Sequence, residues 1–117
     1  MIQYAMASDR GEEKLSRLHD PLHPAILHLL SSAIENARRA RRPVTLCGEA
    51  AGESRLTRLM LCLGLTRLSM NAAQIPQVRA EIERTDCGRL SAFARRILKA
   101  ETPSAAADIL GEMNEAG

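Results

Sequence analysis

The sequence is almost devoid of aromatic residues. Its 117 residues include no tryptophan, one tyrosine and one phenylalanine, so a core must be built from Leu, Ile, Val, Ala and Met. Proteins that bind single-stranded nucleic acid use aromatic side chains to stack bases, and two aromatic residues do not make such a platform. The formal net charge of +2 also lacks the strong basic bias of nucleic-acid binders. We therefore expect no nucleic-acid partner.

The sequence also lacks closely spaced cysteines and long apolar runs. Cys47, Cys62 and Cys87 are odd in number and widely separated, which predicts neither a zinc cluster nor a disulfide framework. Residues 1–14 (MIQYAMASDRGEEK) contain no signal-peptide core. No apolar run approaches the roughly 18–20 residues of a membrane span. We expect a protein of the reducing cytoplasm with no membrane partner.

The sequence does contain a long amphipathic helix pattern after the DPLHP segment at residues 20–24. Asp20 can cap this helix, which we expect to end at Pro43. Its basic last turn (Arg38, Arg39, Arg41 and Arg42) is interpreted as helix-dipole compensation on a solvated face; a site for phosphate or an acidic partner is the alternative. The apolar positions recur at helical spacing over about four turns: Ile26, Leu29, Leu30, Ala33, Ile34 and Ala37.

Two short β-prone runs follow, each succeeded by a helix pattern. Residues 44–47 (VTLC) predict a buried parallel strand, and residues 65–70 predict a second strand. Helices are expected from near residue 53 to 63 and over 75–84, 90–99 and 104–113, the last capped by Thr102, with the final NEAG frayed. The residues expected to face inward are Leu56, Leu59, Met60, Leu63, Ile75, Val78, Ile82, Leu90, Phe93 and Ile97.

This order of elements is typical of an α/β fold with a parallel sheet. Two strands cannot form a sheet that is buried on both faces. The sequence therefore predicts a slice of a larger α/β fold.

The segment CGEAAGES, at residues 47–54, is the candidate site. It follows the first expected strand, and α/β folds place their active sites at the carboxyl ends of strands. Gly48 and Gly52 would allow a ligand to approach the backbone, and Glu49 adds a carboxylate. Cys47 is either a small buried residue or a functional thiol, and position alone leaves both open. Cys62 is interpreted as a small buried residue.

Four collinear segments carry a resemblance to a known family. TLCGEAAGESR resembles the MCGE-(L/M)-AGD strand-loop signature of enzyme I of the phosphoenolpyruvate:sugar phosphotransferase system. IQYAMASDRG, LHDPLHPAIL and LGLTRLSMNAAQIPQVR resemble further segments of that family in the same order. The matches cover about residues 2–79 and become sparse after about residue 85.

The resemblance implies a fold and a chemistry. The fold is the C-terminal segment of a (β/α)8 TIM barrel, helix-rich, with two short parallel strands and about five helices. Residues 1–117 would form one unit, with barrel elements in 1–85 and a helical tail in 86–117. Cys47 falls on the family's proton donor, and Arg10 on its phosphoenolpyruvate-binding arginine, whose guanidinium suits phosphate or carboxylate. Gly48 and Glu49 would support them.

The resemblance also implies Mg²⁺ as cofactor of the complete family enzyme, and phosphoenolpyruvate, a phosphocarrier protein and a second copy of the chain as partners. The family's Asn-Asp pair, which supplies a metal ligand, precedes the segment that matches residues 1–4. Its phosphohistidine domain is also absent from this sequence. We therefore expect that this chain alone binds no metal and transfers no phosphate. None of His19, His23 and His28 is expected to carry the phosphoryl group, and His23 is interpreted as structural. A dimerising or regulatory module derived from the barrel is the alternative function.

Overall fold

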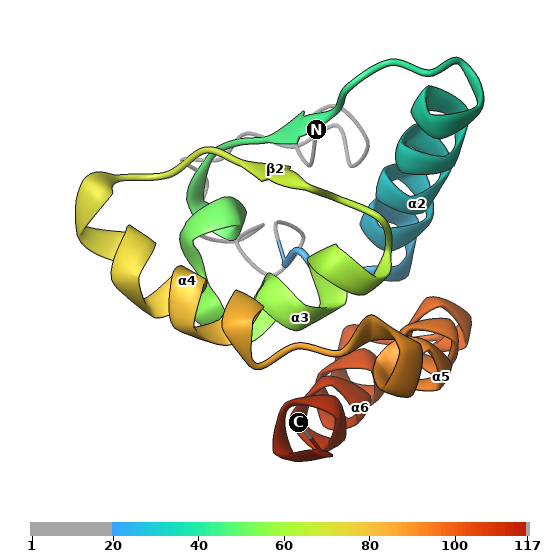
Figure 1. The fold of residues 1–117 in the computed structure, drawn as a ribbon. Coiled ribbons are helices and arrows are strands. Elements are labelled where there is room, and N and C mark those ends of the chain that lie inside the picture. The colour runs from blue at the N-terminus through green and yellow to red at the C-terminus, as the bar shows by residue number, and fades with distance from the viewer. Residues whose placement is uncertain (1–19, 117) are drawn as a thin grey trace, which may run out of the picture.

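The computed structural model of the chain describes residues 20–116. Two short parallel strands, β1 (Thr45–Leu46) and β2 (Arg67–Leu68), lie side by side, with Thr45 opposite Arg67 and Leu46 opposite Leu68. Helix α2 (Pro24–Arg39) precedes them, α3 (Ser54–Cys62) connects them, and α4 (Ile75–Glu83) follows them. Helices α5 (Cys87–Lys99) and α6 (Pro103–Ala116) pack as a pair beneath α3 (Figure 1). The helix-rich α/β pattern with two parallel strands is therefore confirmed.

Helix α3 is the centre of the described structure. It packs against α4, α5, α6 and the short 3-10 helix η2 (Glu49–Gly52). Five consecutive residues of α3, from Leu56 to Met60, are buried, which is possible only for a helix contacted on several sides. The remaining core residues come from the neighbouring elements and include Leu22, Leu27, Leu65, Leu90, Ile97, Leu110 and Met113.

Local signals explain where the helices begin. Helix α5 begins three residues before its expected start because the Asp86 carboxylate accepts hydrogen bonds from the backbone of Gly88 and Arg89. The Thr102 hydroxyl accepts one from the Ala105 N–H at 3.1 Å, as predicted for the start of α6. Asp20, however, does not cap α2. Its carboxylate accepts from Leu22 in the preceding turn, and His23 is the N-cap residue, its Nδ1 accepting from the Ala25 N–H at 3.2 Å.

The expected end of α2 at Pro43 was also wrong. The helix ends at Arg39, because Arg41 adopts a left-handed conformation with φ 56°. The Arg42 N–H then donates to the Ala37 carbonyl at 2.9 Å, and the Arg41 N–H donates to the Arg38 carbonyl. This pattern of two bonds closes a helix C-terminus and usually has glycine at the left-handed position. Gly64, with φ 111°, occupies that position after α3, as predicted.

Several expectations about burial were wrong. The first strand is not buried, since Thr45 is exposed and Leu46 is only partly covered. Leu29 is exposed on α2, beside a buried stripe formed by Ile26, Leu27, Leu30 and Ile34. Ile75 and Ile82 lie on either side of Val78 in α4, and both are exposed, whereas Val78 is buried.

The expected fraying of the final NEAG was wrong for its first three residues. Helix α6 extends to Ala116. The Asn114 side chain donates from Nδ2 to the Arg55 carbonyl at 2.9 Å, which ties the last described turn of α6 to α3.

Candidate functional site

The segment after β1 presents its reactive groups to solvent. The strand ends at Leu46, and Cys47, Gly48 and Glu49 follow it directly, all three exposed. The Ser69 N–H donates to the Leu46 carbonyl at 2.8 Å, so the segment after β2 begins beside the same edge. The thiol therefore lies at the carboxyl end of a parallel strand pair, which is where the sequence analysis expected it.

Two glycines shape the segment in different ways. Gly48 has φ 89° and ψ −167°, a combination that is accessible essentially only to glycine. Its Cβ position is open, so conformation and not space requires glycine there. Gly52 is buried, and a Cβ on it would meet the Gln74 side-chain amide at 2.1 Å. Gln74 therefore lies directly against the segment, at the start of α4.

The other predicted site residue is not placed. Arg10 lies outside the described residues, so its proposed role next to Cys47 stays a prediction. Cys47, Gly48 and Glu49 are consecutive in the chain and lie together at the end of β1, and their role as a site stays a prediction.

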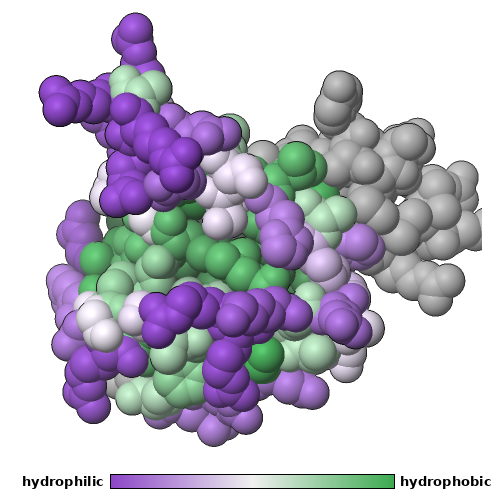
Figure 2. All heavy atoms as spheres, turned by 90° about the vertical axis from the view of Figure 1, so that its right-hand side faces the viewer, coloured by the Kyte–Doolittle hydropathy of each residue, from purple (hydrophilic) through white to green (hydrophobic). Residues whose placement is uncertain are grey.

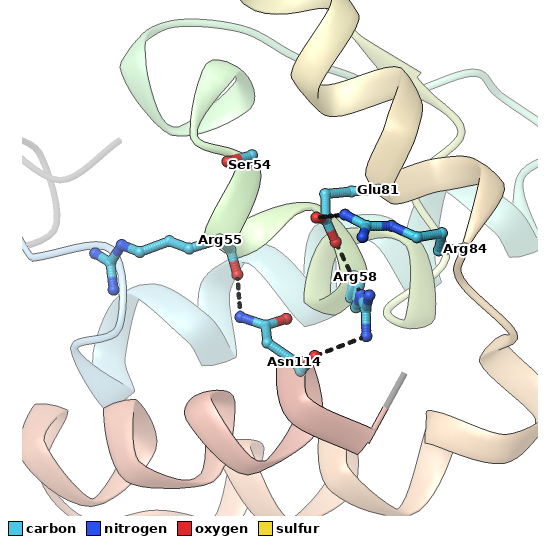
Figure 3. Close-up of a pocket in the computed structure, with 6 residues that line it drawn as sticks. All are labelled: Ser54, Arg55, Arg58, Glu81, Arg84 and Asn114. Atoms are coloured by element: carbon cyan, nitrogen blue, oxygen red, sulfur yellow. Dashed lines mark hydrogen bonds and ion pairs between the residues drawn. The ribbon is translucent and has the colours of Figure 1, made fainter.

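A second polar cluster was missed by sequence reasoning. Arg58 on α3 is buried, with 4% of its side chain exposed, and its Nε donates to Glu81 of α4 at 3.0 Å. Its Nη1 donates to the Asn114 carbonyl of α6 at 3.0 Å, and Arg84 forms an ion pair with the same Glu81. Figure 3 shows these side chains converging from three helices around a pocket of about 220 Å³.

The Arg58 cluster has the character of a structural connection. The positive charge of Arg58 is paired with Glu81 between three helices, so it holds these helices together and is not free to bind a ligand. The signal available in the sequence was an arginine next to Leu59, a residue expected on the buried face of the helix.

The basic end of α2 is solvated, as interpreted from the sequence. Arg38 and Arg39 both form ion pairs with Glu35, at 2.9 Å and 3.2 Å, and are three-quarters exposed. The hydrogen bond from Arg38 lowers the pKa of Glu35. Figure 2 shows the face that includes α2 and α5, where apolar side chains form a continuous area bordered by polar ones. Leu29, 45% exposed, is the large apolar residue that α2 leaves open.

Two further findings concern metals and membranes. Within residues 20–116, no group of three or more His, Cys, Asp or Glu side chains is placed to hold a metal ion. No helix in the same range is long and apolar enough to cross a membrane.

Comparison with known proteins assigns the class. Residues 1–87 match the family described as PEP-utilising enzyme, PEP-binding domain, and because this match covers most of the chain, the chain belongs to that family. It is 42% identical over 113 residues to the phosphoenolpyruvate-protein phosphotransferase of Cupriavidus necator, which covers 97% of this chain and 19% of the relative. The enzymes of the same name from Haloferax volcanii and Bacillus subtilis are 40% and 38% identical over 94% and 87% of this chain, and 20% and 18% of their own lengths. The chain thus spans about a fifth of the length of these relatives.

Proposed function

We propose that this chain forms part of the phosphoenolpyruvate site of a phosphoenolpyruvate-protein phosphotransferase. In the complete enzyme, the phosphoryl group of phosphoenolpyruvate passes to a histidine on another domain and then to a phosphocarrier protein. The observation that carries the proposal is the exposed Cys47 thiol, at the carboxyl end of β1 and in a chain that belongs to the PEP-binding family. Active sites of α/β barrels are built at this end of the strands.

Each residue of the proposed site has a role. When the phosphoryl group leaves, the enolate of pyruvate remains, and Cys47 donates its S–H proton to the methylene carbon to give pyruvate. A free thiol is mostly protonated at neutral pH, so it can serve as this general acid. Arg10 binds an anionic group of the substrate. Gly48 lets the backbone turn away directly after the thiol, and Glu49 supports the site from the adjacent position.

The arrangement of elements supports a segment of a (β/α)8 barrel. A helix, α3, connects the parallel neighbours β1 and β2, and α4 follows β2. Helices of such a barrel pack against their neighbours in the outer ring. Ile75 and Ile82 of α4 are 41% and 43% exposed, and we propose that barrel elements of the complete enzyme cover them. In this division residues 1–85 contribute to the barrel and 86–117 form a helical tail.

Mg²⁺ would neutralise phosphate charge in the complete enzyme. This cation prefers several oxygen ligands in an octahedral arrangement. At the strand ends, the described residues offer the single carboxylate of Glu49, which does not fit a complete site. The steps proposed for this chain therefore involve only its own side chains. We place the activity, and the encounter with the phosphocarrier, in the cytoplasm.

A chimeric enzyme tests the proposal. The matching segment of the Cupriavidus necator phosphotransferase is replaced by this chain, and phosphate transfer from phosphoenolpyruvate to the phosphocarrier is measured. We expect an active chimera. Cys47→Ala should lower its rate about 10²–10⁴-fold, the usual contribution of a general acid.

The Cys87→Ala chimera is the matched control, since Cys87 lies at the start of α5 and outside the Cys47 segment. It should retain its rate. Equal rates for the unmodified and Cys47→Ala chimeras would contradict the role of Cys47 as the proton donor.

The exposed apolar side chains favour a second candidate, a self-associating module. Leu29, Ile75 and Ile82 are each more than 40% exposed, and a two-stranded sheet has open edges that can pair with another chain. Light scattering after size exclusion separates the two. A stable dimer that becomes a monomer after Ile75→Gln and Ile82→Gln substitution would support the module. A monomeric unsubstituted chain would contradict the module and leave the enzyme segment as the remaining proposal.

A further inference from the structure

Two half-buried cysteines face each other across the interface between α3 and α5. Cys62 is the last residue of α3, and Cys87 is the first residue of α5. Their Sγ atoms lie 3.0 Å apart, although the residues are 25 positions apart in the chain. Both are free thiols. The third cysteine, Cys47, lies apart from this pair at the exposed end of β1.

The backbone holds both thiols in place. The turn after α3 is closed by two hydrogen bonds, from Gly64 to the Leu61 carbonyl and from Leu65 to the Met60 carbonyl, each at about 3 Å. The start of α5 is fixed by the Asp86 cap. Helices α3 and α5 also pack directly against each other. The two sulfur atoms therefore meet as a consequence of the fold, and a bond between them requires an approach of only about 1 Å.

We propose that Cys62 and Cys87 form a reversible redox site, which a low-molecular-weight disulfide such as oxidised glutathione converts to an intramolecular disulfide. The site goes beyond the proposed phosphotransferase function and does not depend on it. Where disulfides occur in cytosolic proteins, they are usually transient and often redox-sensing.

The reaction balances in two exchange steps. The Cys87 thiolate attacks one sulfur of oxidised glutathione, a mixed disulfide forms on Cys87, and one glutathione thiolate leaves. The Cys62 thiol then loses its proton and attacks the Cys87 sulfur, and the second glutathione leaves as a thiolate. Two protein thiols are oxidised, one glutathione disulfide is reduced to two thiols, and excess reduced glutathione reverses the reaction.

The order of the two attacks follows from the surroundings of Cys62. Burial, together with the hydrogen bond to Cys87 and the charges of Cys87 and Asp86, raises the pKa of the Cys62 thiol to about 12. Cys62 is therefore protonated at neutral pH, and the attacking thiolate is that of Cys87. In the second step the Cys62 sulfur already lies 3.0 Å from the Cys87 sulfur, so the high effective concentration of an intramolecular attack offsets the raised pKa of Cys62.

Peptide mapping of the full chain tests the proposal directly. The chain is incubated with mixtures of reduced and oxidised glutathione, quenched in acid, alkylated and digested with trypsin. Arginines at 58, 67, 84 and 89 place Cys62 in the peptide 59–67 and Cys87 in the peptide 85–89. We expect these two peptides joined by a disulfide, with Cys47 outside the cross-link. The oxidised chain should show a melting temperature about 5–15 °C higher, and dithiothreitol should reverse the change.

Two variants test the order of attack. Cys62→Ser should stop at glutathione attached to Cys87, and Cys87→Ser should leave Cys62 largely unmodified at neutral pH. Cys47→Ser is the matched control and should form the same cross-link as the unsubstituted chain. Glutathione on Cys47 without a 59–67 to 85–89 cross-link in the unsubstituted chain would overturn the proposal, and this measurement requires no variant to fold.

Discussion

Among the described residues that have positive φ angles, Gly48 and Arg41 differ in what a substitution is expected to do. Gly48 has φ 89° and is the residue that such a conformation favours, whereas Arg41, with φ 56°, is not. The Gly48 conformation places the turn directly after Cys47, and the Arg41 conformation ends α2. A side chain on a left-handed residue crowds the following carbonyl oxygen. Each position can therefore be tested by adding a Cβ atom at Gly48 and removing the Cβ atom at Arg41.

We predict that Gly48→Ala destabilises the chain by about 1–3 kcal/mol and that Arg41→Gly stabilises it by about 0.5–1 kcal/mol. Space is not the cause at Gly48, since no atom lies within 4 Å of its Cβ position. Urea unfolding measures both free energies. Arg42→Gly is the control for Arg41, because it removes a neighbouring exposed arginine without a left-handed conformation to relieve. Equal stability changes at 41 and 42 would contradict the explanation.

At the scale of the elements, much of the secondary structure could be predicted because its signals are local. The Thr102 cap and Gly64 after α3 act within a few residues of their own positions. Burial was less predictable, because periodicity defines a helix face but does not say what covers it. Leu29 and Ile82 fit a helical apolar stripe and are nevertheless exposed.

For the candidate site too, the sequence predicted local features better than contacts between distant residues. The sequence placed Cys47 at a strand end because strand and loop are adjacent in the chain. It could not predict that Arg58 and Glu81, 23 residues apart, form an ion pair, or that Cys62 meets Cys87. These contacts depend on how α3 packs against α4 and α5. Cys62 is also less buried than the sequence analysis expected.

The Arg58 cluster predicts a large effect at the helix interface. Glu81→Gln leaves the Arg58 guanidinium, 4% exposed, without its carboxylate partner. Removing one partner of a buried ion pair is expected to destabilise the chain by about 3 kcal/mol. Thermal or urea unfolding measures the loss. Glu35→Gln is the matched control, because it breaks ion pairs with two arginines that are 75% exposed, and it should destabilise the chain far less than Glu81→Gln. A similar loss for both variants would mean that burial of Arg58 does not strengthen its pairing.

At the scale of the whole molecule, the family and the length of the chain must be considered together. It belongs to the PEP-binding family and spans about a fifth of the relatives that it matches. Phosphoryl transfer depends on several charged groups that position the phosphate and neutralise it. At the strand ends, the described residues supply one thiol, Cys47, and one carboxylate, Glu49. Neither group is a cation, so neither can neutralise the phosphate.

We therefore predict that the purified chain, without further polypeptide, transfers no detectable phosphate from phosphoenolpyruvate to a phosphocarrier protein in the presence of Mg²⁺. Radiolabelled phosphoenolpyruvate and gel separation of the carrier measure the transfer. The active chimera described above is the positive control, since it contains the same Cys47 segment within a complete enzyme. Labelled carrier in the reaction with the chain alone would contradict the prediction. It would mean that residues of this chain position and neutralise the phosphate by themselves, and Arg10, together with the arginines at the end of α2, would be the first groups to substitute.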